Sequence, residues 1–506
     1  MLGHPRTRFG WPLLACIVVM LFACGGGDPP PLAIRSEIAV VGSEAGVSPH
    51  IQFVTLRSSD LADLTAISFQ IRPKVGARAK AVTARYSMRY LQSRRRADTA
   101  VNDVRLPIFG LYAGARNNVD LIVEFKDGSI RQLTQVVETP ARSSTLVYDG
   151  VKILTARRAG DDLGFDFFYV KAGGGTPVVI DTDGAVRWVG AGSENSFSSI
   201  FSNGEFYIGS QSSLAFKRLG LDGQVTDGSI TPMGLYKKFH HNIDSGKFGF
   251  LAEFDGSQNG TAIVESMIAD IDPTGVVRKS WDFADIVANH MRTAGDAADQ
   301  FVRPGIDWFH MNAAFYDSRD DSLIVSSREN FVIKVDYQTG NILWILGDPT
   351  KYWYSFPSLR AKALRLSAGG LYPIGQHAVS INSAGELLLF NDGAPSFWQP
   401  AGAPVGETRA YSAVSAYAVD PVAMTAREVW NFDYGRSVLS DVCSSVYESR
   451  SRSMLVSYAV ASGRTKARLV GLTAAREVAF DFEYSTTGCD TSWNATLIDF
   501  DRLRFD

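Results

Sequence analysis

Short apolar stretches that alternate with polar residues dominate the chain from about residue 33 onward, a pattern typical of β-strands. One unit recurs: an apolar strand, a turn rich in Asp, Asn and Gly, and a second strand that usually carries a large aromatic residue. A further pair of short strands precedes most of these hairpins. The six copies lie around Trp188, Asp222, Trp281, Trp344, Trp430 and Phe480.

Recurring four-stranded units are typical of β-propeller blades, so the sequence predicts an all-β fold with a six-bladed β-propeller over residues 149–506. The segment WNATLIDF (493–500) follows the sixth hairpin and is expected to close the ring by joining the first blade. The segment FADIVANHMRTAGDAADQ (283–300) interrupts the strand pattern and is predicted to be a helical insertion. The tryptophans of the hairpins are interpreted as structural.

Residues 33–148 lack the repeated hairpin. Alternating segments such as HIQFVTLR (50–57) and NNVDLIVEFKDG (117–128) predict a small N-terminal β-sandwich. The basic segment SRRRADTA (93–100) is interpreted as a solvated loop, with an anion-binding patch as the alternative.

The first residues have the pattern of an export signal. Arg6 and Arg8 precede an apolar run that stops at Cys24. Residues 1–23 are predicted to be a lipoprotein-type signal peptide, Cys24 the lipidated residue and 24–32 a linker; a plain signal peptide cut nearby is the alternative. Such a protein would lie on the periplasmic side, anchored to the outer membrane. Export permits a disulfide, so Cys443 and Cys489 are either bonded or two separate buried thiols.

Composition narrows the function classes. The 506 residues are 45% hydrophobic and carry a formal net charge of -3, which indicates a globular protein without the basic surface that nucleic acid requires. Loss of residues 1–23 removes Arg6 and Arg8 and leaves 48 basic against 53 acidic side chains. No cofactor is expected, and the sequence allows a homodimer.

Four histidines stand where the innermost strands of neighbouring blades are expected to begin: His240 and His241 in FHHNID, His310 in WFHMNAAF, and His377 in GQHAVSI. The first strand of each propeller blade lines the central channel, so these side chains should meet at one mouth. Asn312 shares a strand face with His310, and Arg328 ends the next strand. No Asp or Glu occupies a matching position.

Three histidines could hold a zinc ion with one open position. A fixed arginine beside a divalent metal is unfavourable, however, and the same residues suit an anion: Arg328 offers a fork of donors, and protonated histidine and Asn312 add more. One neutral imidazole could then act as nucleophile or base. The plain alternative is that each histidine only satisfies polar groups of the channel.

The chain resembles the bacterial arylsulfotransferases (aryl-sulfate sulfotransferases). The similarity is clearest over residues 307–349 and extends to FHHNI, GQHAVSI followed by LLLFNDG, WNATLIDF and residues 106–121. The resemblance implies a six-bladed propeller behind a β-sandwich. It also implies ping-pong transfer of a sulfuryl group from an aryl sulfate donor to a phenolic acceptor through a sulfohistidine, without a nucleotide donor.

The resemblance also implies residue roles. His377 would be the nucleophile, and the sulfuryl oxygens would be bound by His310, Asn312 and Arg328. A further histidine would exchange a proton with the phenol oxygen; the family motif favours His241, whereas the local repeat aligns His240 with His310. Asn242 stands where the family usually has Asp, which puts in doubt a carboxylate that orients this histidine.

Aromatic residues near the mouth, including Trp308, Phe309 and Tyr352–Tyr354, could stack on phenol rings; packing within the blade is the alternative. Three other functions remain open from the sequence: a non-catalytic membrane-anchored scaffold, a quinoprotein-like dehydrogenase and a metal-dependent propeller enzyme.

Overall fold

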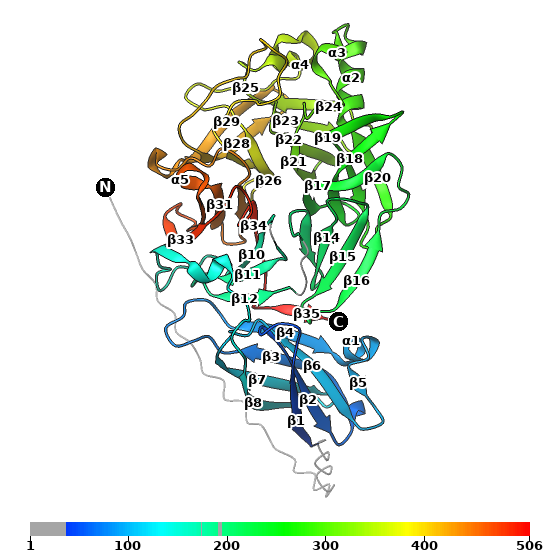
Figure 1. Cartoon of the computed structure of the whole chain (residues 1–506), viewed down its shortest axis with the longest axis vertical. Coiled ribbons are helices and arrows are strands. Elements are labelled where there is room, and N and C mark those ends of the chain that lie inside the picture. Colours follow the sequence, from blue (N-terminus) through cyan, green and yellow to red (C-terminus); the bar gives the residue numbers. More distant parts are fainter. Residues whose placement is uncertain (1–36, 174, 191–194) are drawn as a thin grey trace, which may run out of the picture.

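The computed structural model describes residues 37–173, 175–190 and 195–506. The proposed signal peptide, Cys24 and the linker 24–32 lie outside these residues. The described chain is built almost entirely from antiparallel β-sheets, as the alternating pattern predicts (Figure 1). None of the helices among the described residues is long and apolar enough to cross a membrane.

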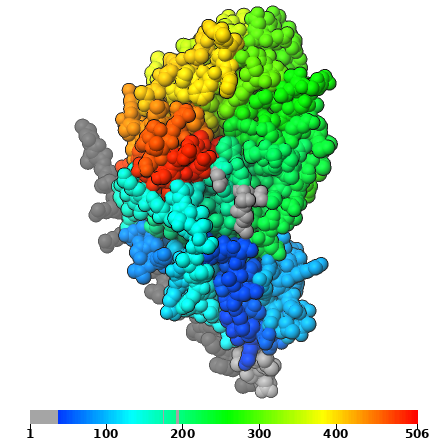
Figure 2. All heavy atoms as spheres, in the orientation of Figure 1, coloured from blue at the N-terminus to red at the C-terminus, as the bar shows by residue number. Residues whose placement is uncertain are grey.

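Two sheets form the N-terminal lobe, which Figure 2 shows in blue beneath the larger body. Their inward side chains, such as Leu56, Phe69 and Leu121, belong to one hydrophobic core. Burial of such apolar faces is the main drive for packing two sheets together. The first sheet contains β1 (Ile38–Ala45), β2 (Ile51–Ser58), β6 (Asp103–Phe109) and β5 (Ala97–Asp98); the second contains β35 (Leu503–Phe505), β4 (Val82–Ser87), β3 (Leu64–Ile71), β7 (Arg116–Phe125) and β8 (Ile130–Glu138).

Six further sheets follow along the chain. Sheet 1 contains β12 (Val186–Val189), β11 (Val178–Asp181), β10 (Phe167–Lys171) and β34 (Asn494–Leu497); sheet 2 contains β13 (Ser199–Ser202), β14 (Glu205–Gly209), β15 (Ala215–Gly220) and β16 (Val225–Ser229); sheet 3 contains β17 (Tyr236–Ser245), β18 (Phe250–Gln258), β19 (Thr261–Ile271) and β20 (Val277–Asp282). Sheet 4 contains β21 (Met311–Asp317), β22 (Ser322–Ser327), β23 (Val332–Asp336) and β24 (Ile342–Leu346); sheet 5 contains β26 (Gln376–Ile381), β27 (Leu387–Asn391), β28 (Ala413–Asp420), β29 (Thr425–Phe432) and β25 (Arg365–Leu366); sheet 6 contains β30 (Ser445–Glu448), β31 (Met454–Val460), β32 (Lys466–Leu472), β33 (Val478–Ser485) and β9 (Lys152–Thr155).

The six sheets are arranged around a common centre, because a hydrophobic cluster lies between each sheet and the next, including between sheets 6 and 1. The segment WNATLIDF contains β34, which pairs with β10 as the sequence indicates. A second closure was not expected: β9, from the start of this region, pairs with β33. The chain then leaves the ring, and β35 pairs in parallel with β4 of the N-terminal lobe.

Short helices and turns connect the sheets: η1 (Leu61–Asp63), α1 (Met88–Ser93), η2 (Val147–Gly150), α2 (Phe283–Thr293), α3 (Ala298–Phe301), η3 (Tyr352–Ser355), α4 (Pro357–Arg360), η4 (Tyr434–Arg436) and α5 (Ala461–Arg464). The predicted helical insertion is α2, which Asp282 caps by accepting a hydrogen bond from the Ala284 amide. The rings of Phe283 and Phe309 stack with centroids 5.2 Å apart, so α2 supports the segment that precedes His310.

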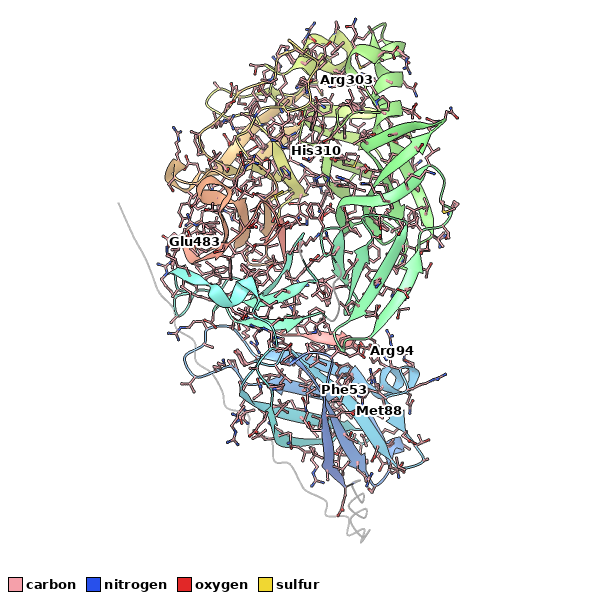
Figure 3. All side chains as sticks on the ribbon, in the orientation of Figure 1. Phe53, Met88, Arg94, Arg303, His310 and Glu483 are labelled. Atoms are coloured by element: carbon pink, nitrogen blue, oxygen red, sulfur yellow. A yellow bond between two sulfur atoms is a disulfide. The ribbon has the colours of Figure 1, made fainter. Side chains whose placement is uncertain are left out.

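Most residues of the basic segment 93–100 are exposed, as predicted for a solvated loop, but two of its arginines are paired. Arg94 pairs with Glu205 at 2.8 Å and Arg96 with Asp222 at 2.7 Å, both across the junction with sheet 2. Figure 3 shows Arg94 at this junction. The sequence could not reveal these partners because they lie more than a hundred residues away, in the ring.

Candidate active site

The innermost strands of sheets 3, 4 and 5 share a backbone distortion. The register of β17 shifts after His240, that of β21 after Met311 and that of β26 after His377. His241, His310 and Ala378 have positive φ angles of 37°, 51° and 52°. Such conformations cost on the order of 1–3 kcal/mol each for residues other than glycine and persist where the surrounding structure enforces them. The bulges allow adjacent residues of one strand to point toward the same side.

Glu265 brings three of the predicted histidines together. Its Oε1 lies 2.9 Å from Nε2 of His240, and its Oε2 lies 3.4 Å from Nδ1 of His241 and 2.8 Å from Nδ1 of His310. Asp307 Oδ2 lies 2.6 Å from the same nitrogen of His310. The rings of His241 and His310 are 4.7 Å apart. Figure 3 shows His310 near the centre of the ring of sheets.

The repeat places no Asp or Glu at positions that match the histidines, but two carboxylates reach them from other positions. Glu265 comes from β19, the third strand of its sheet, where the register with β18 is broken after Phe254 and φ of Glu265 is 48°. Asp307 comes from the segment before β21. Neither position matches a histidine in the repeat, so comparing repeats could not detect them.

The carboxylates set different charges on neighbouring histidines. Burial alone would lower the pKa of His310, but Glu265 and Asp307 raise it to about 10, so this imidazole is protonated at neutral pH. Burial, with the nearby His240, lowers the pKa of His241 well below its ordinary value. Burial would raise the pKa of Glu265, but His310 and His241 outweigh this effect and hold it far below its usual range. The site therefore contains an imidazolium beside a neutral imidazole.

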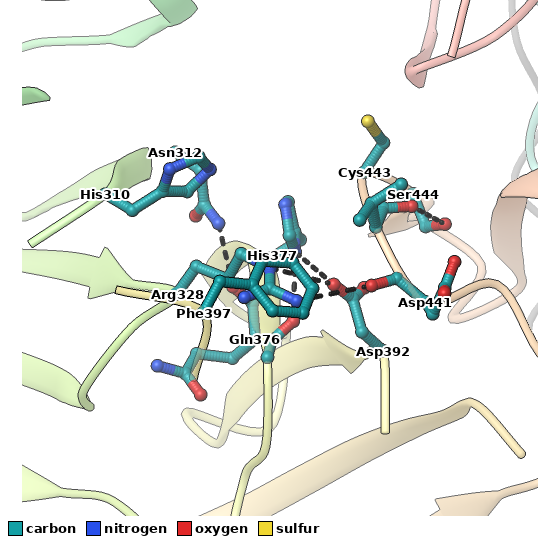
Figure 4. A network of polar contacts seen from close by, with 12 residues as sticks. His310, Asn312, Arg328, Gln376, His377, Asp392, Phe397, Asp441, Cys443 and Ser444 are labelled. Atoms are coloured by element: carbon teal, nitrogen blue, oxygen red, sulfur yellow. Dashed lines mark hydrogen bonds and ion pairs between the residues drawn. The ribbon is translucent and has the colours of Figure 1, made fainter. Parts of the chain in front are cut away.

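His377 is buried and held by its Nδ1 atom. Nδ1 lies 3.0 Å from the carbonyl oxygen of Gly375 and 3.3 Å from Oδ2 of Asp392 (Figure 4). A carbonyl oxygen only accepts, so Nδ1 carries the proton and a neutral ring has its lone pair on Nε2. No hydrogen bond to Nε2 is present among the described residues. Burial raises the pKa of Asp392, against the influence of His377 and Arg328.

Arg328 lies beside His377, and its guanidinium already contacts a carboxylate, a carbonyl oxygen and an aromatic ring. Nη1 donates to Oε1 of Glu329 at 3.0 Å, Nη2 donates to the carbonyl oxygen of Asp441 at 3.3 Å, and the ring of Phe397 covers the guanidinium at 3.6 Å (Figure 4). Its Nε has no hydrogen-bond acceptor in the described part of the chain, although Oδ2 of Asp392 lies 3.6 Å away. Nη1 also donates to the carbonyl oxygen of Pro395 at 3.4 Å, so Arg328 keeps its Nε–H and one N–H of Nη2 without an acceptor among the described residues.

Asn312 is buried at the same mouth, where its Nδ2 donates to the carbonyl oxygen of Gln376 at 2.9 Å. Asn242 has a different role: its Oδ1 accepts from Nζ of Lys171 at 2.5 Å, and its Nδ2 donates to Oδ1 of Asp244 at 2.8 Å. Burial lowers the pKa of Lys171 to about 8 and raises that of Asp244 to about 6. Asn242 thus links sheets 1 and 3, and the carboxylate at the histidines is Glu265.

The aromatic residues considered for stacking follow the packing alternative, and Tyr352 and Tyr354 are partly buried against the core between sheets 3 and 4. Trp308, Phe309 and Trp353 are fully buried in the core between sheets 3 and 4 and cannot stack on a substrate. Phe397 and Trp398 are half exposed instead, at 50% and 51%, and their amides donate to the buried carboxylate of Glu329. In the sequence these two residues stand shortly after β27 and the motif LLLFNDG. This position is the sequence feature that could have pointed to them.

Two overlapping sets could hold a metal ion: His240, His241 and Glu265, and Glu265, Asp307 and His310. Each brings candidate ligand atoms within 4.8 Å of one another. Three of the four nitrogen–oxygen contacts are 2.6–2.9 Å long, however, which is the length of charge-assisted hydrogen bonds, and shared protons account for them. Cys443, which lies near the polar network of His377 (Figure 4), forms a disulfide with Cys489.

Comparison with solved structures gives weak overlaps. A protein of unknown function from Bacteroides thetaiotaomicron aligns over 93% of both chains with a TM-score of 0.32 and 8% identity. BamB from Moraxella catarrhalis aligns over 74% of this chain and 96% of its own, with a TM-score of 0.26 and 11% identity. These values are too low to inform the arrangement described above.

Sequence relatives are more informative. Arylsulfate sulfotransferase AssT of Escherichia coli O6:H1 is 31% identical over 157 residues, which are 28% of this chain and 25% of the relative. Arylsulfate sulfotransferase AssT of Lelliottia amnigena is 22% identical over 292 residues, 47% of each chain. The matched parts thus span less than half of either relative. The family model described as Arylsulfotransferase (ASST) matches residues 154–494, which include all four histidines, Asn312 and Arg328, and the chain belongs to this family.

Proposed function

We propose that the protein moves a sulfuryl group from a phenolic sulfate ester to a phenolic acceptor, by a ping-pong reaction through a sulfohistidine and without a nucleotide donor. Membership of the arylsulfotransferase family supports aryl sulfate transfer in general. The observation that carries the finer proposal is the tautomer of His377: Nδ1 donates to Gly375, which leaves a lone pair on Nε2.

In the donor half-reaction, Nε2 of His377 attacks the sulfur atom. The S–N bond forms while the S–O bond to the aryl group breaks, and the electron pair leaves with the phenolate oxygen. That oxygen takes a proton from a site histidine or from water, or leaves as phenolate when the phenol is acidic. Asp392, 3.3 Å from Nδ1, stabilises the positive charge that develops on the ring.

The transferring group carries its negative charge on three oxygens, and the site offers donors for them. His310 is an imidazolium, Arg328 has its Nε–H free of a hydrogen-bond acceptor, and Asn312 has a second amide hydrogen. Donors that are fixed before the reaction stabilise such charge without having to reorganise. The carboxylates Glu265 and Asp307 keep the site from being strongly cationic, which favours release of the anionic product.

In the acceptor half-reaction, the phenol O–H bond breaks as its oxygen attacks the sulfur of sulfo-His377. The S–N bond breaks, and its electron pair returns to Nε2. We assign the proton to His241 rather than His240, because the ring of His241 lies 4.7 Å from His310. No ring contact between His240 and His310 is found among the described residues.

The test of this function uses purified protein and 4-nitrophenyl sulfate, with and without phenol, and with EDTA added to each. Release of nitrophenolate should be stimulated by phenol and unaffected by EDTA. Loss of activity on chelation would favour a metal-dependent enzyme. An absence of release from any aryl sulfate would favour a non-catalytic binding scaffold.

Separate substitutions should distinguish the two adjacent histidines. His241→Ala is expected to lower the rate of the acceptor step by about 10²- to 10⁴-fold, the usual contribution of a general base, whereas His240→Ala should cost less than about 10-fold. The initial burst of nitrophenolate should survive in both, since 4-nitrophenolate leaves without needing a proton. Burst kinetics followed by phenol addition measure the two steps, and a larger loss in His240→Ala would reverse the assignment.

We further propose that the six sheets are the blades of a β-propeller and that the N-terminal lobe is a β-sandwich. The hydrophobic cluster between each sheet and the next supports the first point, and the core shared by the two N-terminal sheets supports the second. We propose that the protein is exported and anchored through Cys24. The disulfide between Cys443 and Cys489 supports export, because such bonds persist in oxidising compartments.

A further inference from the structure

The carboxylate of Glu265 contacts histidines and nothing else among the described residues. Its oxygens lie within 3.4 Å of nitrogens of His240, His241 and His310, and no backbone hydrogen bond to the carboxylate is found among the described residues. Its side chain is only 11% exposed. Burying a charge is costly unless it is paired, and this one is paired only with groups that can gain or lose a proton. The arrangement is therefore suited to setting the protonation of the histidines.

The backbone is distorted at each end of these contacts. Glu265 has φ 48°, His241 φ 37° and His310 φ 51°, and all three residues meet through their side chains. Two of them belong to strands of the same sheet, β17 and β19, which are separated by β18. A regular ladder would leave neither His241 nor Glu265 in this position, so the two bulges together create the contact.

We propose that Glu265 divides the charge among the three histidines: it holds His310 as an imidazolium at 2.8 Å, and its Oε2, 3.4 Å from Nδ1 of a neutral His241, favours the tautomer of His241 that leaves Nε2 free for the acceptor's proton. Glu265 is thus a positioning residue for the proposed sulfuryl transfer, on which this inference rests. When the phenol O–H bond breaks, the proton moves to Nε2 of His241, and Glu265 stabilises the imidazolium that forms.

The other charged and titratable groups around this unit do not replace Glu265. Among the described residues the carboxylate of Asp307 pairs with His310 alone, and burial raises the pKa of Asp307. Burial raises the pKa of Glu253 well above its usual value, and Oε2 of Glu253 accepts a hydrogen bond from the Asn242 amide at 3.2 Å. The groups that face the unit are His240, His241 and Asp244 from β17, Glu253 from β18, Asp307 and His310 before β21, Glu329 after β22, His377 from β26, and Lys171 from β10.

The proposal is tested with Glu265→Gln, which keeps the shape and removes the charge. Asp270→Asn is the matched control, because Asp270 is buried in the same strand and bonds only the Lys247 and Phe248 amides and the Tyr337 hydroxyl. NMR titration of ¹⁵N-labelled histidines should show His310 protonated at pH 8 in the wild type and the control. In Glu265→Gln its pKa should fall toward the ordinary 6.5.

The pH dependence of activity should follow from the raised pKa of His310. A raised pKa keeps His310 charged below about pH 10, so wild-type kcat/KM for the donor should not lose this contribution between pH 6 and 8. In Glu265→Gln the loss should grow across this window and reach about 10²-fold at pH 8, a size typical of lost acid–base or charge stabilisation. Glu265→Asp keeps the charge and should recover part of it.

Three results would overturn the proposal: His310 neutral at pH 8 in the wild type, a Glu265→Gln profile parallel to that of the wild type, or a stoichiometric divalent metal in the purified protein bound to this cluster. The NMR titration needs no substrate. It therefore stays informative if the protein fails to transfer sulfuryl groups, and the wild-type titration alone decides the point if Glu265→Gln does not fold.

Discussion

His377→Ala is expected to abolish sulfuryl transfer, with a loss of at least about 10⁴-fold in kcat, because removal of a nucleophile eliminates the covalent route rather than weakening it. The imidazole is buried, its Nδ1 is fixed by Gly375, and Nε2 has no described hydrogen-bond partner. Initial rates with 4-nitrophenyl sulfate and phenol measure the loss. His290→Ala, on helix α2, is the control and should keep wild-type turnover.

Mass spectrometry checks the same assignment without turnover. Wild-type protein treated with donor alone should carry one added sulfuryl group on the peptide that contains His377, and His377→Ala should carry none. The N–S bond is labile in acid, so digestion near neutral pH or above is needed. A label on the peptide that contains His310 would assign the nucleophile to the neighbouring blade and contradict the roles given above.

Arg328→Met is expected to reduce both activity and stability. Removal of the guanidinium leaves Asp392 and Glu329 buried without their cation, and breaking a buried pair in this way typically costs about 3–5 kcal/mol. Loss of the free Nε–H should also lower kcat by about 10²- to 10³-fold, as for one donor to a developing anion. Urea unfolding followed by tryptophan fluorescence measures the first effect and initial rates the second.

Two variants sharpen this test. Arg319→Met removes an arginine that is half exposed and pairs with Asp317 in the same sheet, and it should cost no more than about 1 kcal/mol. Arg328→Lys keeps the charge but loses the planar fork, so it should retain more stability than activity. If Arg328→Met unfolds at the same urea concentration as Arg319→Met, the buried cation is not what holds this side of the site together.

The sequence was sufficient to place the histidines because they occupy one position of a repeated unit. His310 and His377 each stand at the start of an innermost strand, and the hydrogen bond from Asn312 to Gln376 joins the two strands beside them. Glu265 could not be found in this way. It reaches the site only because β19 is bulged, and a bulge changes which side chains point inward without leaving a pattern in the residue types.

The aromatic residues illustrate the same limit. Trp308 and Phe309 immediately precede His310 in sequence, but both side chains pack into the core between α2 and sheet 4. Phe397 comes from the segment after β27, and its backbone amide donates a hydrogen bond to the carboxylate of Glu329. The N-terminal lobe was predictable from strand alternation, whereas its ion pairs with sheet 2 depended on contacts far apart in the chain.

Two sheets are completed by β34 and β35, which are synthesised after the other strands of the described chain. β34 completes sheet 1, whose other three strands are made more than three hundred residues earlier, and β35 completes a sheet of the N-terminal lobe that is made earlier still. Phe505 of β35 stacks on Tyr86 with ring centroids 4.7 Å apart. Until these residues leave the ribosome, two sheets have an unpaired edge, which invites pairing with other chains. Neither sheet can therefore complete its pairing before β34 and β35 have been made, and the two sheets finish folding together.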